Sequence, residues 1–185
     1  REAMQLLMGY SSFNGYVWNK LFDLQLIREN DIRFHADYPA CEDTMFVGSY
    51  LYHCSRVCVT EECLYCYRQV SGGANRGRYS GRKAYDPKWM SVFEMTEYMA
   101  DLYKDDAVTA ACRLHEVREA GIVLRSMEAA GYHGADHARL KGILRRGAGL
   151  FFRDENSGRS QKLSVLLSCI SPKLELAVWK LRNRK

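Results

Sequence analysis

The chain has 185 residues and a mass of 21.3 kDa, which is enough for one domain with a real hydrophobic core, or for one and a half small ones. Apolar residues make up 47% and charged residues 26%, a balance that excludes a disordered chain and a coiled coil. No apolar run approaches the roughly 18–20 residues that span a bilayer, so we expect no transmembrane helix.

Charge is unevenly distributed along the sequence. The formal net charge is +5, yet residues 139–185 hold twelve basic and three acidic residues, while residues 1–138 are slightly acidic. A basic tail of this kind predicts an anionic surface as a partner, either lipid or nucleic acid. The chain opens at Arg1 without a targeting signature, so we expect an internal piece or a carboxy-terminal half.

Residue patterns predict the elements in chain order. Apolar side chains at helical spacing predict helices at residues 2–8, 21–29 and 44–54. β-branched and aromatic composition predicts two short strands, at 56–60 and 64–70. Residues 71–83, with four glycines and four basic residues, are expected to form a loop. After residue 86 the strand signals end, and helical stripes predict helices at 89–103, 111–124, 135–146 and 161–181, the last interrupted near Pro172.

These elements predict two parts of different character. Residues 1–83 are expected to be an α/β segment, and residues 84–185 an all-helical extension with a basic amphipathic tail. We find no internal repeat.

Seven cysteines are an odd number without a secretory signal, which favours a reduced, cytosolic compartment. The spacing of Cys54, Cys58, Cys63 and Cys66 is compatible with a zinc site. Residues three apart on the predicted strand point to opposite faces, however, so Cys63 and Cys66 are not expected to share one metal. Packed thiols are the preferred interpretation.

Two histidines, His133 and His137, are four residues apart. Gly131 and Gly134 interrupt any helix there, and the sequence reading finds no carboxylate that completes a metal-ligand set. These histidines are therefore interpreted as structural or exposed.

Four motifs follow one another in the first part of the chain. They are GYVWNKLF at 15–22, ENDIRF at 29–34, EDTMF at 42–46 and LYCYRQ at 64–69. In this order and spacing, residues 9–75 resemble the second half of the family 2 glycosyltransferases, which are inverting enzymes of the GT-A fold. The resemblance implies that residues 1–83 are the carboxy-terminal half of a Rossmann-like GT-A catalytic domain, on its acceptor side.

The same resemblance implies an activity. The enzyme would be a hexosyltransferase-type glycosyltransferase that moves a sugar from a nucleotide-sugar donor to a hydroxyl of a glycan or lipid-linked acceptor, in surface polysaccharide assembly. The family's metal-binding Asp-x-Asp motif is absent from the sequence. The resemblance therefore implies a divalent metal, Mg²⁺ or Mn²⁺, with ligands outside this chain, and implies that these 185 residues alone are inactive.

The acidic pair Glu42–Asp43 stands at a predicted loop-to-helix junction. Inverting transfer needs a carboxylate that takes the proton of the acceptor hydroxyl as its oxygen attacks the anomeric carbon. A helix N-terminus stabilises the ionised form of such a group. By the resemblance, Asp43 is the catalytic base and Glu42 a supporting acid. The alternative is that Asp43 only caps a helix that begins at Thr44.

Four further residues are assigned to substrate binding by the resemblance: Trp18, Asn19, Lys20 and Arg68. An indole stacks on a sugar ring, and amide and ammonium groups reach hydroxyls or phosphate. Arg68 would neutralise the leaving nucleoside diphosphate. The alternatives are that Trp18 is a core aromatic and Lys20 a solvated residue. Closure of the basic side chains of residues 71–83 over the site is one interpretation; the other, preferred for each of them taken singly, is that they are solvated loop charges.

The basic tail allows a different class of function, a non-catalytic module that binds membrane or nucleic acid. Aromatic residues are too few among its basic residues for a nucleic-acid platform, so no nucleic-acid partner is expected. Residues 161–185 alternate apolar and basic side chains, which predicts docking on an anionic membrane surface. The protein would then be cytoplasmic and peripheral on the inner face of the cell membrane. The alternative is that the apolar face packs on the helices of residues 86–146.

Overall fold

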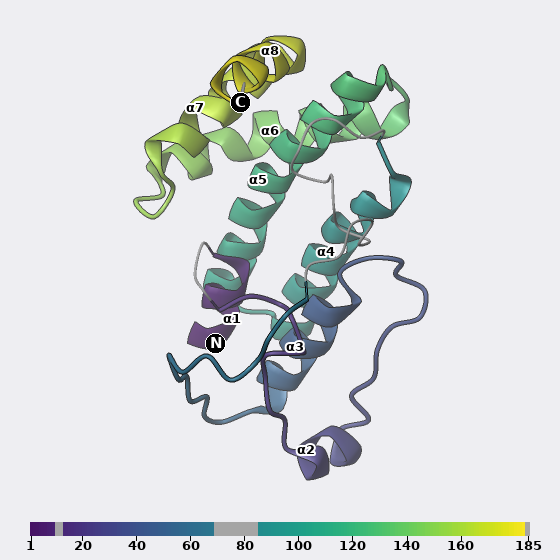
Figure 1. Cartoon of the computed structure of the whole chain (residues 1–185), viewed down its shortest axis with the longest axis vertical. Coiled ribbons are helices and arrows are strands. Elements are labelled where there is room, and N and C mark those ends of the chain that lie inside the picture. Colours follow the sequence, from purple (N-terminus) through teal and green to yellow (C-terminus); the bar gives the residue numbers. More distant parts are fainter. Residues whose placement is uncertain (10–12, 69–84, 184–185) are drawn as a thin grey trace. The chain divides into compact units, whose positions relative to one another are not determined.

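The computed structural model describes residues 1–9, 13–68 and 85–183. Within these ranges every regular element is a helix, and no strand is present (Figure 1). The elements are α1 (Glu2–Met8), α2 (Leu24–Glu29), α3 (Glu42–His53), the 3-10 helix η1 (Pro87–Met90), α4 (Ser91–Tyr103), α5 (Asp106–Ala130), α6 (Ala135–Arg153), α7 (Arg159–Ile170) and α8 (Pro172–Arg182).

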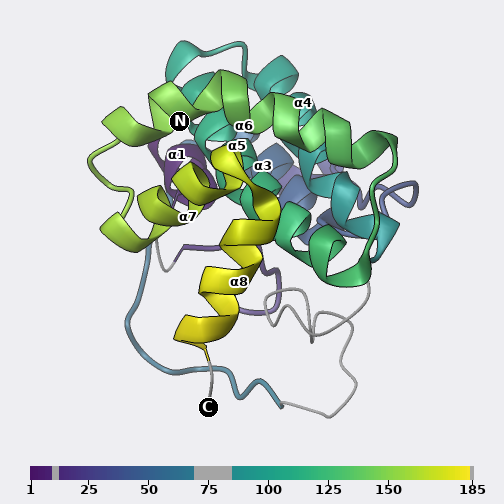
Figure 2. The same ribbon diagram turned by 90° about the horizontal axis from the view of Figure 1, so that it is seen from above.

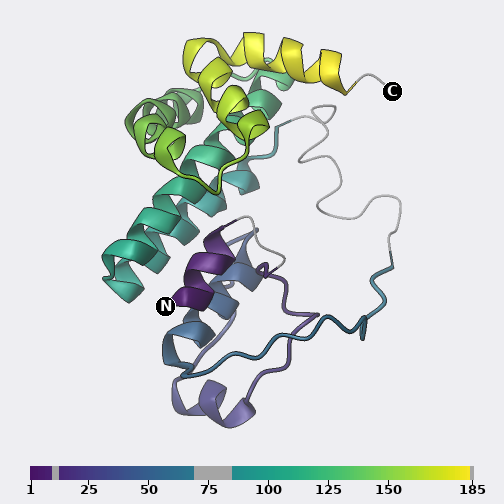
Figure 3. The ribbon, with the colours of Figure 1, turned by 90° about the vertical axis from the view of Figure 1, so that its left-hand side faces the viewer.

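The predicted α/β, GT-A-like fold is wrong for the part of the chain that the structure describes. Strands were expected at 56–60 and 64–70, but residues 55–68 are irregular and exposed throughout (Figure 3). β-branched and aromatic residues favour extended backbone, yet a strand forms only when its N–H and C=O groups pair with a neighbour, and two short strands alone are marginal. Cys63 and Cys66 are therefore not held on opposite faces of a strand, and strand geometry does not exclude a shared metal. Residues 69 and 70 and the predicted loop at 71–83 lie outside the described ranges.

The predicted helices are confirmed, with shifted ends. α3 begins at Glu42, two residues before the expected start, and its N-cap Cys41 has left-handed backbone with φ 69°. The expected break near Pro172 separates α7 from α8, and Pro172 occupies the first turn of α8, where its missing N–H costs nothing. Apolar periodicity reports the buried face of a helix, whereas capping decides where the helix ends.

By internal packing the chain divides into two compact units. Of the described residues, the first unit holds 1–9, 13–68 and 88–113, and the second holds 85–87 and 114–183. Helix α5 therefore begins in the first unit and ends in the second. The sequence predicts a different division, between residues 83 and 84, into a catalytic part and an appended helical part. That functional division stays a prediction.

The first unit is built on contacts of α3 with α1, α2 and α4. Its core is rich in methionine, and its largest fully buried side chains include Met4, Met8, Met45, Phe93, Met95 and Met99. Gly48 on α3 faces the end of the Met99 side chain without room for a Cβ atom. The Tyr103 hydroxyl donates a hydrogen bond of 2.8 Å to the Gly48 carbonyl, which ties α4 to α3.

In the second unit, α7 packs on both α6 and α8 (Figure 2). Its fully buried side chains include Leu124, Met127, Leu140, Leu144 and Phe151. Gly147 on α6 lies directly against Val117 on α5, so a side chain there would push the two helices apart. No helix in the described ranges is both long and apolar enough to cross a membrane, which confirms the expectation for those residues.

Candidate active site

The predicted catalytic residues lie where residues 13–20 pack against the first turn of α3. Gly15 lies so close to Thr44 that no Cβ atom fits between them. Two residues later, the backbone of Val17 hydrogen-bonds the carboxyl group of Asp43. The structure thus brings residues of the GYVWNKLF and EDTMF motifs into contact.

The environment of Asp43 suits a general base. Partial burial raises the pKa of the Asp43 carboxyl above its usual range, and the neighbouring charge of Glu42 raises this pKa further. The Val17 hydrogen bond and the Lys20 charge act in the opposite direction and are smaller. A carboxylate with a raised pKa accepts a proton more readily at neutral pH.

The alternative interpretation required Asp43 to cap helix α3, but Asp43 is not the capping residue. Helix α3 begins at Glu42, and its N-cap is Cys41, whose side chain makes no capping hydrogen bond. Asp43 is half-buried inside the first helical turn, and its carboxyl is bonded to the loop at Val17. The first turn of a helix still favours the ionised form of such a carboxylate.

Lys20 holds the loop together. Its Nζ atom donates hydrogen bonds to the carbonyl oxygens of Asn14 (2.5 Å) and Tyr16 (2.7 Å) and to Oδ1 of Asn19 (2.9 Å). An ammonium group has three donors, so these bonds use all of them. Burial lowers the pKa of Lys20, while the nearby Asp43 carboxylate raises it. With its three hydrogen bonds made inside the loop, Lys20 gives the site a fixed positive charge and does not point outward to a substrate.

Trp18 lies in a stack of aromatic rings and not in the hydrophobic core. Its ring centroid is 5.2 Å from Tyr16, 4.8 Å from Tyr65 and 4.9 Å from Tyr67, all in stacked geometry. The three tyrosines are 44%, 53% and 55% exposed. These four residues form what we call the aromatic wall, and two of them, Tyr16 and Trp18, flank Val17 in the sequence. The flat faces of such rings fit the apolar face of a sugar.

The three tyrosines of the aromatic wall were not assigned from the sequence. Tyr65 and Tyr67 are two residues apart, which in an extended segment places them on one side, and this was the available signal. That they stack on Trp18 depends on the tertiary arrangement, which no local pattern records.

The remaining predicted residues are at the edge of this arrangement. Asn19 is exposed and accepts the Lys20 hydrogen bond, and Glu42 is half-buried beside Asp43. Arg68 is exposed and directly follows Tyr67, so its role at the diphosphate stays a prediction. The basic residues Arg76, Arg78, Arg82 and Lys83, interpreted either as a closure over the site or as solvated loop charges, lie outside the described ranges.

The resemblance places the ligands of its Mg²⁺ or Mn²⁺ ion outside this chain, and the residues around Asp43 do not form a site for that ion either. Such an ion takes oxygen ligands, several of them charged, whereas Asp43 already has the positive charge of Lys20 nearby. In the described part of the chain, the group with metal-ligand geometry is Glu128, His133 and His137, which lies in the second compact unit. We therefore derive no metal-dependent step at Asp43.

Comparisons of the chain with protein-family models, with curated proteins and with solved structures find no match. The glycosyltransferase resemblance therefore rests on the order and spacing of the four sequence motifs alone.

Proposed function

We propose that residues 13–68 carry the acceptor side of an inverting glycosyltransferase active site, with Asp43 as the catalytic base. One observation carries this proposal: the partly desolvated Asp43 carboxyl is hydrogen-bonded by the backbone of Val17, whose sequence neighbours Tyr16 and Trp18 belong to the aromatic wall. A proton acceptor next to exposed ring faces is the combination that a sugar hydroxyl requires.

In the proposed reaction, the acceptor hydroxyl gives its proton to the Asp43 carboxylate. The acceptor oxygen forms a bond to the anomeric carbon of the donor from the face opposite the leaving group. The bond from that carbon to the nucleoside diphosphate breaks, and the diphosphate leaves with the electron pair. Because the attack comes from the opposite face, the anomeric configuration inverts.

The residues of this chain have separate tasks in that reaction. The exposed rings of Tyr65 and Tyr67 stack on the acceptor glycan, or on the sugar of a lipid-linked acceptor. Lys20 keeps the loop in place, and Glu42 helps to keep the pKa of the base raised. Arg68 stands at the end of the wall, where a cation would meet the diphosphate. We assign the nucleotide-sugar site and the divalent metal to residues outside this chain, so the 185 residues alone transfer no sugar.

A screen of donors and acceptors tests this proposal. The full-length protein is incubated with a panel of nucleotide-sugars and with free and lipid-linked glycans, and products are detected by mass spectrometry. We expect transfer from a nucleotide-sugar to a hydroxyl, with an inverted anomeric carbon in the product NMR spectrum. Retention of configuration, or release of nucleotide with no glycosylated product from any pair, would contradict the proposal.

A second proposal concerns the carboxy-terminal helices α7 and α8. Five of their large apolar side chains are 43–67% exposed: Leu163, Leu166, Ile170, Leu174 and Leu181. Lys173, Lys180 and Arg182 are also exposed on α8. We propose that this apolar and basic surface meets anionic lipid, which would keep the enzyme at the cytoplasmic face of the membrane.

Part of the predicted tail faces the protein instead. Leu176 and Glu175 are buried, and the guanidinium of Arg125 lies 5.0 Å from the ring centroid of Trp179. Trp179 is therefore held on α5 and is not assigned to the lipid headgroups. The packing alternative accounts for these residues, and the lipid proposal rests on the five exposed apolar side chains.

A further inference from the structure

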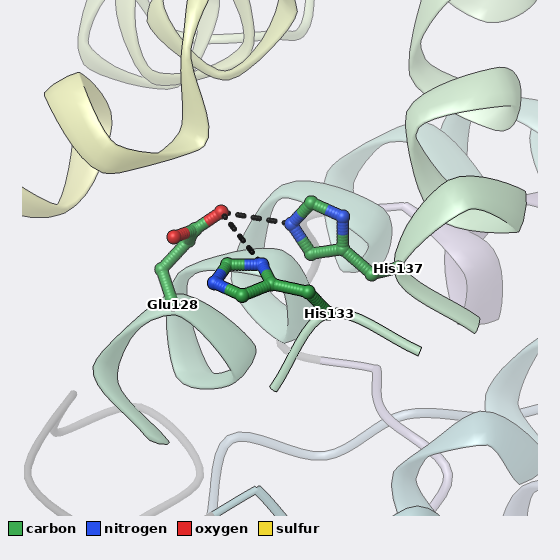
Figure 4. A group of neighbouring side chains, drawn as sticks. All are labelled: Glu128, His133 and His137. Carbon is green, nitrogen blue, oxygen red and sulfur yellow. Dashed lines mark hydrogen bonds and ion pairs between the residues drawn. The ribbon is translucent and has the colours of Figure 1, made fainter. Parts of the chain in front are cut away.

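Three side chains with metal-ligand atoms meet where α5 ends and α6 begins (Figure 4). Glu128 lies in the last turn of α5, His133 in the connection, and His137 in the first turn of α6. Oε1 of Glu128 is 2.8 Å from Nε2 of His137 and 3.8 Å from Nδ1 of His133. The ligand atoms of all three lie within 4.8 Å of one another, so the carboxylate that the sequence reading did not find is present in space.

The backbone turn that builds this cluster depends on Gly131. Its φ of +69° is a left-handed conformation that other residues adopt only with strain. Tyr132 N–H donates to the Met127 carbonyl at 2.9 Å, and Gly131 N–H donates to the Glu128 carbonyl at 3.2 Å. This pair of bonds is a Schellman motif, which ends α5 and reverses the chain. The reversal carries His133 back toward the carboxylate of Glu128.

Burial and charge show why this carboxylate needs partners. The side chain of Glu128 is 4% exposed, that of His137 12%, and that of His133 49%. A buried carboxylate is costly unless it is paired or bound to a metal. Both imidazoles turn a nitrogen toward the same oxygen, which is also the arrangement of ligands around one cation (Figure 4).

The distances suit a metal that prefers imidazole and carboxylate ligands. Zinc binds these groups at about 2.0–2.2 Å in tetrahedral geometry, so two of its ligand atoms stand roughly 3.3–3.6 Å apart. The two separations from Oε1, 2.8 and 3.8 Å, lie on either side of this range, and small side-chain rotations reach it. Two histidines and one carboxylate leave the fourth position open, as in sites that also hold a water molecule.

We propose that Glu128, His133 and His137 bind one divalent metal ion of the zinc class. Glu128 and His137 supply buried ligands, and the half-exposed His133 closes the site on its solvent side. The ion clamps the end of α5 to the start of α6 and stabilises the folded chain, because the unfolded chain offers no preformed site. This proposal does not depend on the glycosyltransferase activity.

The test is a titration of the chain with Zn²⁺ in competition with a chromogenic chelator. The exposed thiols would compete for zinc, so the reference protein carries Cys58→Ser, Cys63→Ser and Cys66→Ser. We expect one equivalent of bound zinc, a rise in Tm on adding zinc, and X-ray absorption showing nitrogen and oxygen ligands only. Each of His133→Ala, His137→Ala and Glu128→Gln should weaken binding at least about tenfold, since loss of even an outer-shell partner costs 10–100-fold.

His53→Ala is the matched control, because His53 is exposed on α3 and belongs to no such cluster in the described residues. His133→Ala is the decisive variant, because the His133 side chain is half-exposed and its loss should leave the metal-free fold intact, which circular dichroism checks. The proposal is overturned if the reference protein binds no zinc, if sulfur is found among the ligands, or if His133→Ala binds zinc as tightly as His53→Ala.

Discussion

Gly15 lies directly against Thr44, so close that a Cβ atom on Gly15 would overlap the Thr44 side chain. This contact fixes residues 13–20 on the first turn of α3, where Val17 reaches Asp43. The absence of a side chain at Gly15 thus allows the loop to approach α3 closely enough for Val17 to hydrogen-bond Asp43.

Gly15→Ala should destabilise the chain by about 1–3 kcal/mol, the usual cost of a side chain with no space. Urea unfolding measures this loss, and near-UV circular dichroism should report a disturbed aromatic wall. The control is Gly149→Ala, because Gly149 is in α6 with open space around its Cβ position. Alanine favours a helix by about 1 kcal/mol over glycine, so the control should be stabilised. If Gly15→Ala is as stable as the wild type, Gly15 and Thr44 are not in the close contact described above.

Asp43→Asn should stabilise the chain at neutral pH. The fold raises the pKa of Asp43 above the ordinary value of 3.8, so the folded state holds this proton more tightly than the unfolded state. Stability is therefore lost as the pH rises from 3.8 through the folded-state pKa, and an amide avoids this loss while it can still accept the Val17 hydrogen bond.

Thermal scans at several pH values measure this effect. At pH 7 we expect a small rise in Tm for Asp43→Asn, below the roughly 2–4 °C that 1 kcal/mol gives in a chain of this size. The difference should vanish below the ordinary carboxyl pKa. A lower Tm than wild type at pH 7 would show that Asp43 stabilises the fold as a charge.

Breaking the buried ion pair of Arg125 and Glu175 in the second compact unit should lower the stability of the chain strongly. Nη1 of Arg125 donates to Oε1 of Glu175 at 2.8 Å, and Oγ of Ser164 donates to the same oxygen at 2.6 Å. Glu175→Ala leaves the Arg125 charge buried and unpaired, which should cost about 3–5 kcal/mol in urea unfolding. Arg125→Met combined with Glu175→Leu removes both charges and should cost less.

The control for this pair is Arg33→Met. The Arg33–Asp31 pair is just as short, at 2.6 Å, but both side chains are at least 75% exposed. Exposed pairs contribute about 0–1 kcal/mol, so this variant should stay close to wild type. If the double variant is as unstable as Glu175→Ala, lost packing and not the unpaired charge explains the effect.

Polar substitutions in the apolar and basic surface of α7 and α8, which we propose binds anionic lipid, should weaken membrane binding. Ile170 and Leu174 are 67% and 44% exposed, so Ile170→Ser with Leu174→Ser should preserve the fold. Co-sedimentation with vesicles containing anionic lipid should fall several-fold for this variant, and wild-type binding should weaken in high salt. The matched control is Leu64→Ser, since Leu64 is 77% exposed outside these helices. Equal sedimentation of all three proteins would contradict the proposal.

Helices could be predicted from this sequence because burial of one face leaves a mark every three to four residues, as in Val92, Thr96 and Met99 of α4. The strand predictions failed at 56–60 and over the described part of 64–70, because a strand also needs a partner segment, and partner segments cannot be recognised from the local sequence. The acidic pair Glu42–Asp43 was found because neighbouring carboxylates are conspicuous in a sequence.

The contacts of the two sites could not be predicted in the same way. Lys20 donates its hydrogen bonds to carbonyl oxygens of its own loop, because the backbone of residues 13–20 folds around its ammonium group. The approach of Glu128 to His133 depends on the left-handed backbone at Gly131, which sequence reading took only as an interruption. Both are results of chain reversal, which brings residues together without a periodic signal.

Turnover of the full-length protein carrying Asp43→Asn tests the assignment of the catalytic base most directly. The matched control is Asp37→Asn, since Asp37 is an exposed carboxylate in the loop before α3. We predict that Asp43→Asn lowers turnover by about 10² or more with donor binding nearly unchanged, and that Asp37→Asn has little effect. Turnover of Asp43→Asn near the wild-type rate would contradict the role of Asp43 as the base.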